Sequence, residues 1–314
     1  MTDRLGAPRA EPIFERLALI GVGLIGSSIA RAAREMGLAR TIVAIDRDEG
    51  VVGRVRDLGI ADEATGDALA GVRDCDHVIL CVPVGACGTV AAAIRDGLKP
   101  GAVVSDVGSV KASVVAQVAP HLPEGVAFVP AHPVAGTEHS GPESGFPTLF
   151  LNRWCILTPP EGTPPEALER VRAFWTAMGS NVEIMTPEHH DLVLAITSHV
   201  PHLIAYNIVG TAADLETVTQ SEVIKFSAGG FRDFTRIAAS DPTMWRDIFL
   251  HNKGAVLEML GRLNEDIALL ARAIRWDDGD ALFNLFTRTR AIRRSIITQG
   301  QETPEPDFGR RRPD

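Results

Sequence analysis

The first half of the chain alternates short apolar runs with segments of helical periodicity. The runs are nearly uninterrupted, as in "LALI" from residue 17 and "HVIL" from residue 77, and turn residues follow them. Strands buried on both faces have this pattern, whereas strands with one exposed face alternate apolar and polar residues. The pattern therefore predicts an α/β fold in which helices cover both faces of a parallel sheet. The predicted strands lie within residues 16–23, 41–46, 77–83, 101–108, 126–133 and 153–159.

The pattern becomes entirely helical after residue 186. Thr186 suits the N-cap of a helix and Pro187 its first turn, while Pro201 predicts a kink in the same helix. A second start signal, Asp241 followed by Pro242, precedes about eight turns of helical periodicity. This half is too apolar along one face to stand alone, so we expect it to pair between two copies of the chain. The expected organisation is a flexible N-terminus at residues 1–15, an α/β domain over residues 16–186, a helical domain over residues 187–298 and a disordered tail at residues 299–314.

A glycine-rich turn joins the first predicted strand to the first predicted helix. Gly21, Gly23 and Gly26 fit the spacing G-x-G-x-x-G, and Asp46 ends the next strand about 20 residues later. With a strand before it and a helix after it, this spacing predicts a Rossmann-type dinucleotide-binding site. Asp46 would accept hydrogen bonds from ribose hydroxyls and repel a 2′-phosphate, so we expect NAD in preference to NADP, with Arg47 leaving dual use open. The candidate cofactor-binding residues are Gly21, Gly23, Leu24, Ile25, Gly26, Asp46, Arg47, Val82 and Pro83.

Composition and charge narrow the class of partner. The chain has 314 residues, 45% of them hydrophobic, and a formal net charge of −9. An acidic chain without a basic patch before its C-terminal tail argues against nucleic acid as a partner. The sequence shows no signal-peptide core and no apolar run of membrane-spanning length, so we expect a cytoplasmic protein that does not bind a membrane. No pair of its four cysteines has zinc-site spacing, and we expect no metal.

The segment "PAHPVAGTEHSG", residues 130–141, holds more polar and turn residues than a simple connection needs. It follows a predicted strand, and dinucleotide-binding folds place their reacting groups at the carboxyl ends of strands. His132, stiffened by Pro133, can accept a proton near neutral pH when a hydride leaves the same substrate. Ser109, which follows another predicted strand, is placed to orient the imidazole or the substrate hydroxyl. His139 is expected to be a surface residue.

The helical half adds candidate substrate-binding residues. His199 and His202 are three positions apart and share a face on an unbroken helix, so we expect one to contact substrate and the other to pack. The adjacent His189 and His190 lie in a first helical turn and are expected to be solvated. Residues 227–247 form a predicted loop with three arginines. Guanidinium groups bind carboxylates bidentately, so this loop predicts a clamp for a small anionic substrate in a cleft between the two domains.

Several segments together resemble the prephenate/arogenate dehydrogenases of tyrosine biosynthesis. They are "GVGLIGSSIA", "DVGSVK", "HPVAGTEHSG", "SHVPH" and "GGFRDFTRIAASDPTMWRDIF", in matching order, and the resemblance covers residues 15 to 295. The last two are specific, since other Rossmann dehydrogenases do not carry them. The resemblance implies an NAD-dependent homodimer that oxidises prephenate to 4-hydroxyphenylpyruvate, or arogenate to tyrosine, with loss of the ring carboxylate as CO2.

The resemblance also implies roles for individual residues. His132 accepts the hydrogen bond or proton of the ring hydroxyl, and Ser109 supports both His132 and the substrate. Arg236 binds a substrate carboxylate, His202 reaches the far end of the substrate, and Glu138 gates or orders the pocket. The neutral Thr137 favours prephenate over arogenate, although the adjacent acidic residue leaves this choice open. Two further residues are expected near the substrate, either from the same chain or from a dimer partner: Arg232 and Trp245.

Two other classes of protein share parts of this pattern. A β-hydroxyacid or imine oxidoreductase with a similar domain order would rely on a lysine of the helical domain, and Lys225 and Lys253 are available without that family's surroundings. A non-catalytic NAD-sensing module would keep the glycine fingerprint but would have no need for His132 together with Ser109 and Arg236.

Overall fold

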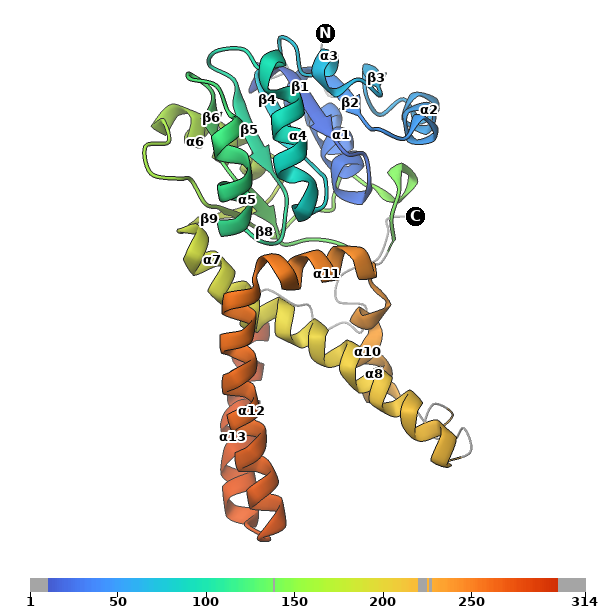
Figure 1. Cartoon of the computed structure of the whole chain (residues 1–314), viewed down its shortest axis with the longest axis vertical. Helices are drawn as coiled ribbons and strands as arrows, with labels where there is room; N and C mark the ends of the chain where they lie inside the picture. Colours follow the sequence, from blue (N-terminus) through green and yellow to red (C-terminus); the bar gives the residue numbers. More distant parts are fainter. Residues whose placement is uncertain (1–10, 138, 220–224, 226–227, 299–314) are drawn as a thin grey trace. The chain divides into compact units, whose positions relative to one another are not determined.

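The computed structural model describes residues 11–137, 139–219, 225 and 228–298, and the chain divides into two compact units, residues 1–256 and residues 257–314 (Figure 1). Three expectations concern residues outside this description: most of the N-terminus at residues 1–15, the tail at residues 299–314, and Glu138.

A parallel sheet forms the centre of the first unit. Its six strands follow the order β3-β2-β1-β4-β5-β6, and every neighbouring pair is parallel. This is the strand order of a Rossmann fold, in which the reversal of winding between β1 and β4 opens a crevice at the carboxyl ends of the strands. The predicted parallel sheet is thus confirmed. The strands are β1 (Phe14–Ile20), β2 (Ala39–Ile45), β3 (Glu63–Thr65), β4 (His77–Leu80), β5 (Val103–Asp106) and β6 (Ala127–Phe128).

Helices cover both faces of this sheet, as Figure 1 shows. Leu17 and Leu19 of β1 enter one hydrophobic core, while Ala18 and Ile20 of the same strand enter another, because successive side chains of a strand point to opposite faces. This explains the nearly uninterrupted apolar runs of the sequence. The connecting elements are α1 (Leu24–Met36), α2 (Glu49–Leu58), α3 (Ala68–Gly71), η1 (Val84–Ala86), α4 (Cys87–Ile94), η2 (Arg95–Gly97), α5 (Ala112–Val118), η3 (Ala119–His121), η4 (Pro142–Ser144) and α6 (Pro165–Ala177).

The segment predicted as one strand at residues 126–133 is divided between two sheets. After β6 the chain passes through Pro130 and enters β7 (Ala131–Pro133), which pairs antiparallel with β8 (Trp154–Leu157); β8 pairs parallel with β9 (Asn181–Ile184). Placing β8 in the parallel sheet was therefore wrong. Pro130 has no N–H to donate to a ladder, which favours a change of sheet at this point. The change places His132 in β7, just beyond the carboxyl end of β6.

The helical half begins as the sequence predicted. The hydroxyl of Thr186 accepts a hydrogen bond from His189 N at 3.2 Å and caps α7 (Pro187–Leu194). The kink expected from Pro201 takes the form of a π-helical turn, η5 (Ala195–His199), directly before α8 (Val200–Thr219). Because proline lacks an N–H and its ring crowds the carbonyl four residues earlier, a widened turn accommodates it without ending the helix.

Two predictions about the later helices were wrong. The arginine-rich segment is not a loop but contains α10 (Gly229–Thr235) and η6 (Arg236–Ala239). The long helix after Asp241 is broken at Asn252 into α11 (Pro242–His251) and α12 (Lys253–Arg275), followed by α13 (Gly279–Thr298). Asp241 does cap α11, since its carboxylate accepts a hydrogen bond from Met244 N at 2.8 Å.

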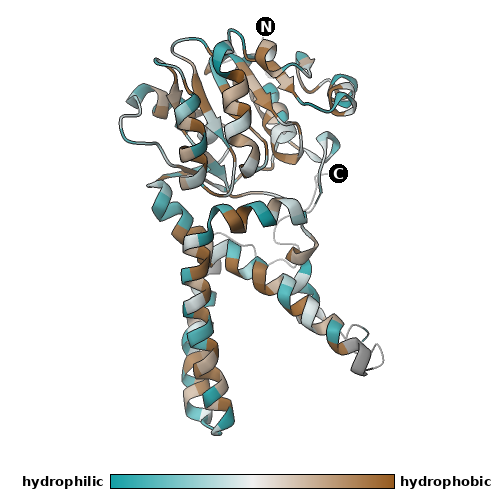
Figure 2. Cartoon of the chain, in the orientation of Figure 1, coloured by the Kyte–Doolittle hydropathy of each residue, from teal (hydrophilic) through white to brown (hydrophobic). Residues whose placement is uncertain are grey.

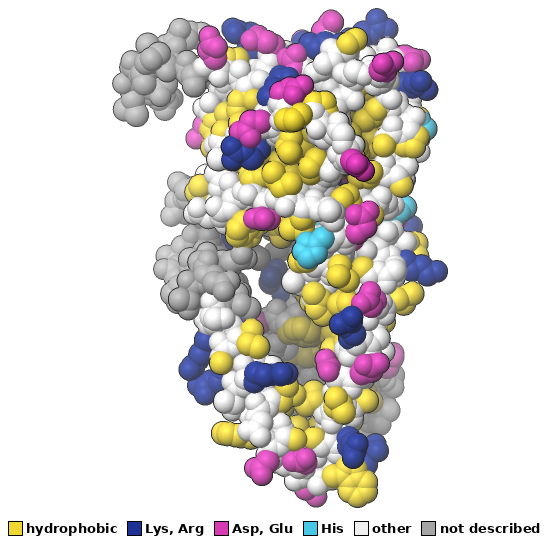
Figure 3. Space-filling view, turned by 90° about the vertical axis from the view of Figure 1, so that its left-hand side faces the viewer, with side chains coloured by type: hydrophobic (Ala, Val, Ile, Leu, Met, Phe, Trp, Pro, Cys, Tyr) yellow, Lys and Arg dark blue, Asp and Glu magenta, His cyan; other side chains and the backbone are white. Residues whose placement is uncertain are grey.

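The second unit, which begins within α12, exposes many large apolar side chains. Figure 2 shows apolar positions recurring among polar ones along α12 and α13, and Figure 3 shows apolar side chains exposed among charged ones on one face of the molecule. Trp276 is 73% exposed and Phe283 is 70% exposed. The other exposed large apolar residues of this unit are Leu257, Ile267, Leu269, Ile274, Phe286 and Ile292. Exposure on this scale is typical of a surface that another chain covers.

One helical stretch, Pro187–Leu215, is long and apolar enough by composition to cross a membrane, with a mean hydropathy of 1.5. From the sequence, no apolar run was expected to reach the length of a membrane span. Such a stretch is weak support for a membrane span, because core helices pass the same test, and His190, Asp191 and His199 within it make buried hydrogen bonds. Its N-terminal part therefore belongs to the folded unit.

Buried histidines make the fold sensitive to acid. His77 is fully buried against the rings of Phe14 and Phe174, and burial lowers its pKa to about 3. In the unfolded chain a histidine takes up a proton below about pH 6.5. The unfolded state therefore gains protons that the folded state does not bind, and we expect the free energy of unfolding to fall as the pH drops from about 6.5 toward about 3. Urea unfolding at a series of pH values measures this.

The test variant combines His77→Phe with Ser105→Ala. Both residues change because Ser105 Oγ is the hydrogen-bonding partner of His77 Nε2, at 2.9 Å. This variant should lose less stability than the wild type over the same pH range. Equal losses in the two proteins would show that His77 is not a source of the acid sensitivity.

Candidate active site

The glycine-rich turn has the geometry that a bound dinucleotide requires. Gly21 has a φ of 93°, and a Cβ there would collide with the carbonyl of Cys81, while a Cβ on Gly26 would collide with the carbonyl of Gly21. A Cβ on Gly23, in contrast, would meet nothing within 4 Å. Gly23 also provides no side-chain cap for α1, and no described side chain caps the first N–H groups of this helix, so they can bind an anion. These features fit the pyrophosphate of NAD.

The ribose-binding candidate Asp46 lies at the end of β2 beside this turn. Its carboxylate accepts hydrogen bonds from Val22 N and Asp48 N, both at 3.0 Å, so the side chain is already oriented. Arg47 next to it is exposed. Of the other predicted contacts, Leu24, Ile25 and Val82 are half-buried, and Pro83 is exposed.

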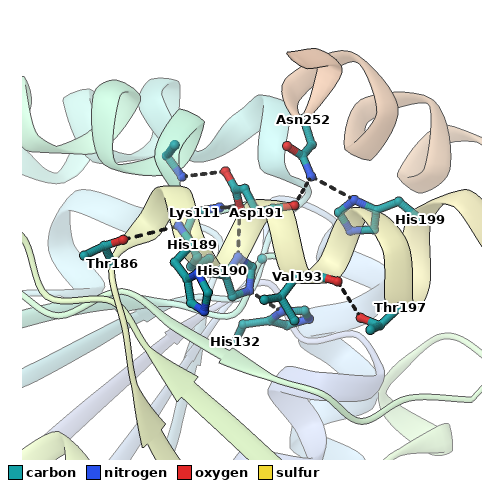
Figure 4. Close-up of polar contacts among 12 residues, drawn as sticks. Lys111, His132, Thr186, His189, His190, Asp191, Val193, Thr197, His199 and Asn252 are labelled. Carbon is teal, nitrogen blue, oxygen red and sulfur yellow. Dashed lines mark hydrogen bonds and ion pairs between the residues drawn. The ribbon is translucent and has the colours of Figure 1, made fainter. Parts of the chain in front are cut away.

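The predicted base His132 lies in a buried chain of hydrogen bonds (Figure 4). Its side chain is 6% exposed, and its Nδ1 lies 2.8 Å from Nε2 of His190. Nδ1 of His190 in turn lies 2.8 Å from Oδ1 of Asp191. His190 is fully buried, so the expectation that it is solvated was wrong, whereas the neighbouring His189 is exposed as expected. His190 is buried because it lies on the face of α7 that packs toward β7.

Asp191 joins this chain to the start of α5. Its carboxylate accepts hydrogen bonds from the backbone N–H groups of Lys111, at 2.8 Å, and Ala112, at 3.0 Å. The fully buried Lys111 ammonium forms an ion pair with Asp106 and donates a hydrogen bond at 2.7 Å to the carbonyl of Ala131, the residue before His132. Buried charges are costly unless they are paired. These contacts therefore hold the backbone at the start of α5 and at Ala131, the residue before His132.

Burial keeps the two histidines neutral near pH 7. It lowers the pKa of His132 well below the ordinary value, and the nearby His190, Lys111 and His199 add to this effect. Burial also lowers the pKa of His190, although the hydrogen bond to Asp191 opposes the change. A neutral imidazole can accept a proton, so His132 is in the form that a base requires.

The helical part contributes a second cluster. The ring of His202 stacks on Trp245 with a centroid distance of 3.6 Å, and its Nδ1 donates to the carbonyl of Ser198 at 2.8 Å. Arg236 lies close enough to add to the lowering of the His202 pKa by burial. Trp245 is 6% exposed and packs in the same core as residues of β4 and β5, so this chain itself supplies it to the cluster.

His199 lies between the two clusters. Its ring approaches Trp245 at a centroid distance of 6.1 Å, and its Nδ1 lies 3.0 Å from the Nδ2 of Asn252, which also donates to the carbonyl of Asp191 at 2.8 Å. Asn252, the C-cap of α11, therefore joins the break between α11 and α12 to Asp191 and His199. The half-buried Ser109 lies beside His199, since its backbone raises the pKa of that histidine against the larger effect of burial.

The segment after His132 returns to α1, the helix that follows the glycine-rich turn. Thr137 is half-buried and its hydroxyl accepts a hydrogen bond from His139 N at 3.3 Å, while His139 itself is exposed as predicted. Further along, Phe146 N donates to Ser28 Oγ at 3.1 Å. The loop that holds the substrate-specificity candidates is therefore attached to α1.

The structure does not bring every candidate into contact. Within the described part of the chain, the Ser109 hydroxyl makes no hydrogen bond to His132, so its supporting role stays a prediction. Arg232 is exposed on α10, and no described hydrogen bond links it to the cluster around His202. Sequence reasoning missed Asp191 and Asn252, expected His190 to be solvated, and assigned no role to Lys111. For Lys111 a signal existed, because it belongs to "DVGSVK", a polar segment at the end of a buried strand.

A Rossmann-type sheet with a glycine-rich turn and a neutral, buried histidine beyond the carboxyl ends of its strands defines a nicotinamide-dependent oxidoreductase. Two family profiles cover almost all of this fold: prephenate dehydrogenase, nucleotide-binding domain, over residues 29–184, and prephenate dehydrogenase, dimerization domain, over residues 186–288. The chain belongs to the prephenate dehydrogenase family.

Individual relatives agree with this assignment. The chain is 42% identical over 292 residues to a cyclohexadienyl dehydrogenase of Zymomonas mobilis, covering 93% of this chain and 99% of that protein. It is 34% identical to a prephenate dehydrogenase of Bacillus subtilis, covering 89% and 75%. A crystal structure of prephenate dehydrogenase from Aquifex aeolicus with hydroxyphenyl propionate and NAD+ is 36% identical, with a TM-score of 0.85 and coverage of 90% and 98%.

The glycine turn allows a matched pair of substitutions. Gly23→Ala adds a methyl group in open space where the pyrophosphate would lie, so we expect an intact fold and weaker NAD binding. Gly26→Ala forces a methyl group onto the carbonyl of Gly21, so we expect the free energy of unfolding to fall by about 1–3 kcal/mol. Calorimetric titration with NAD and urea unfolding measure the two effects. Wild-type NAD affinity in Gly23→Ala would place the cofactor elsewhere.

Proposed function

We propose that this chain catalyses the NAD-dependent oxidative decarboxylation of prephenate to 4-hydroxyphenylpyruvate, with His132 accepting the proton of the ring hydroxyl. The observation that carries the proposal is the buried, neutral His132 beyond the carboxyl end of β6, next to a turn that fits NAD. The names of the relatives support the same reaction, since they are cyclohexadienyl and prephenate dehydrogenases.

The chemistry follows from what each group can do. Bound NAD supplies the acceptor for the hydride of the ring carbinol. His132 takes the hydroxyl proton through Nε2, because its Nδ1 is engaged by His190. The ring carbonyl that results is conjugated through the ring double bonds to the carbon that carries the ring carboxylate. It can therefore accept the electron pair of the breaking carbon–carboxylate bond, so the carboxylate leaves as CO2 and the ring becomes aromatic. Ser109, at the end of the neighbouring strand, supports His132 and the substrate in this proposal.

The cluster on the helical side is proposed to hold the rest of the substrate. Arg236 is exposed, and no described carboxylate pairs with it, so it can bind a carboxylate of the substrate. His202 and Trp245 offer a stacked surface beside it. Thr137 lies on the loop after His132 and is proposed to face the side chain that distinguishes prephenate from arogenate. Glu138, the next residue in the sequence, is proposed to gate or order the pocket. Thr137 carries no charge that would bind the amino group of arogenate, which favours prephenate. Arg232 is proposed as a further contact for the anionic substrate.

We also propose a cytoplasmic homodimer that forms through a helical domain of residues 187–298. The exposed apolar side chains of α12 and α13 and the family's dimerization domain over residues 186–288 support this assembly. In this proposal the α/β domain comprises residues 16–186, with NAD rather than NADP as its main cofactor because of Asp46.

Turnover tests the proposed function directly. Purified protein should form NADH when prephenate and NAD are added, with a higher kcat/KM for prephenate than for arogenate. The His132→Asn variant should lose kcat by about 10²- to 10⁴-fold, the usual contribution of a general base, while its affinity for NAD stays unchanged. Absence of NADH with both substrates would overturn the function, and an unaltered kcat in His132→Asn would overturn the base.

The substrate clamp has a separate test. Arg236→Ala should raise KM about tenfold or more, because a charge-assisted hydrogen bond contributes about 1.5–3 kcal/mol, and kcat should change little. Arg172→Ala is a matched control, since it removes an exposed arginine that pairs with Glu169 on α6. An unchanged KM in Arg236→Ala would place the carboxylate of the substrate elsewhere.

A further inference from the structure

The chain Asp191–His190–His132 fixes which nitrogen of His132 carries a hydrogen. An ionised carboxylate can only accept hydrogen bonds. Asp191 acts as one here, because its two oxygens accept the backbone N–H groups of Lys111 and Ala112. The 2.8 Å contact from His190 Nδ1 to Asp191 Oδ1 is therefore an N–H donated by the histidine. A neutral His190 then has a lone pair on Nε2.

The same reasoning applies to the next contact. His190 Nε2 is an acceptor, so the 2.8 Å contact with His132 Nδ1 must be an N–H donated by His132. The neutral His132 ring then carries its lone pair on Nε2. No described residue forms a hydrogen bond with this nitrogen, so it is the atom left for substrate. The other tautomer of His132 would set two lone pairs against each other in a buried site, where an unmade hydrogen bond costs about 1–3 kcal/mol.

We propose that His190 and Asp191 are positioning residues that hold His132 in the tautomer whose Nε2 accepts the substrate proton. The inference rests on the proposed role of His132 as the base. Neither residue touches the substrate in this arrangement: both are buried, and His190 lies between Asp191 and His132 (Figure 4). Loss of the chain would leave the backbone of His132 held by the β7–β8 pairing and the Lys111–Ala131 contact, with no control over the tautomer of its ring.

Two substitutions at residue 190 separate tautomer control from packing. The amide of Gln reaches the position of Nε2 and can accept the His132 N–H, whereas the shorter amide of Asn reaches only the position of Nδ1. We expect His190→Gln to keep kcat within about threefold of the wild type and His190→Asn to lower it at least about tenfold, with little change in KM. His189→Asn is the matched control, since the exposed neighbouring histidine should tolerate the change without effect.

A spectroscopic measurement tests the same proposal without turnover. Nitrogen-15 NMR of histidine-labelled protein, with His132→Asn used to assign the signals, should show a protonated Nδ1 and an unprotonated Nε2 for His132 in the wild type. His190→Gln should keep this pattern and His190→Asn should lose it. A wild-type His132 protonated on Nε2 would overturn the proposal even if the variants failed to fold. Equal kcat in the Gln and Asn variants would also overturn it.

The two proposals can fail separately. If the wild type does not turn over prephenate or arogenate, the proposed function is wrong, but the NMR pattern still reports whether the chain fixes the tautomer. Asp191→Asn offers one more readout, because an amide can donate to His190 Nδ1 and so reverse both tautomers. The signal of a protonated Nε2 on His132, with a loss of kcat at least as large as in His190→Asn, is the expected result.

Discussion

The carboxylate of Asp191 is the group on which the rest of the site depends. It accepts hydrogen bonds from the start of α5 and from His190 of α7, and so joins the sheet to the first helix of the helical half. A buried carboxylate costs several kcal/mol unless such partners are all present. The site is therefore formed only when the loop after β5, β7 and α7 are folded together, and its geometry is not a property of any one of them.

Local patterns explain how much of the fold the sequence predicted. Each local signal predicted structure within a few residues of itself, and the structure has the predicted elements. These signals are the apolar runs, the spacing of Gly21, Gly23 and Gly26, and the helix start signals at Thr186 and Asp241. His132 was singled out as the candidate base because its position follows a predicted strand. The family resemblance then provided the reaction, which no local pattern contains.

What the sequence did not predict depends on contacts between distant positions. His132 and His190 are 58 residues apart, and Asp191 and Lys111 are 80 residues apart, so neither contact leaves a periodic signal. The side chain of Asn252, at the break between α11 and α12, is likewise held by residues distant in the sequence, Asp191 and His199. The sequence predicted a solvated His190 because this residue lies in a first helical turn. No local pattern shows that this turn packs on β7.

The arrangement also decides how strong a base His132 is in the proposed reaction. A carboxylate in direct contact with its Nδ1 would favour the protonated ring, whereas an intervening imidazole orients the ring and keeps the negative charge of Asp191 one residue farther away. Burial then holds the pKa of His132 well below its ordinary value. Such a base is weak, but the proposed reaction ends in an aromatic ring and loses CO2, so it does not depend on a strong proton acceptor. A weak base whose free form is neutral near pH 7 also stays ready beside an anionic substrate, whose negative charge would otherwise favour its protonation.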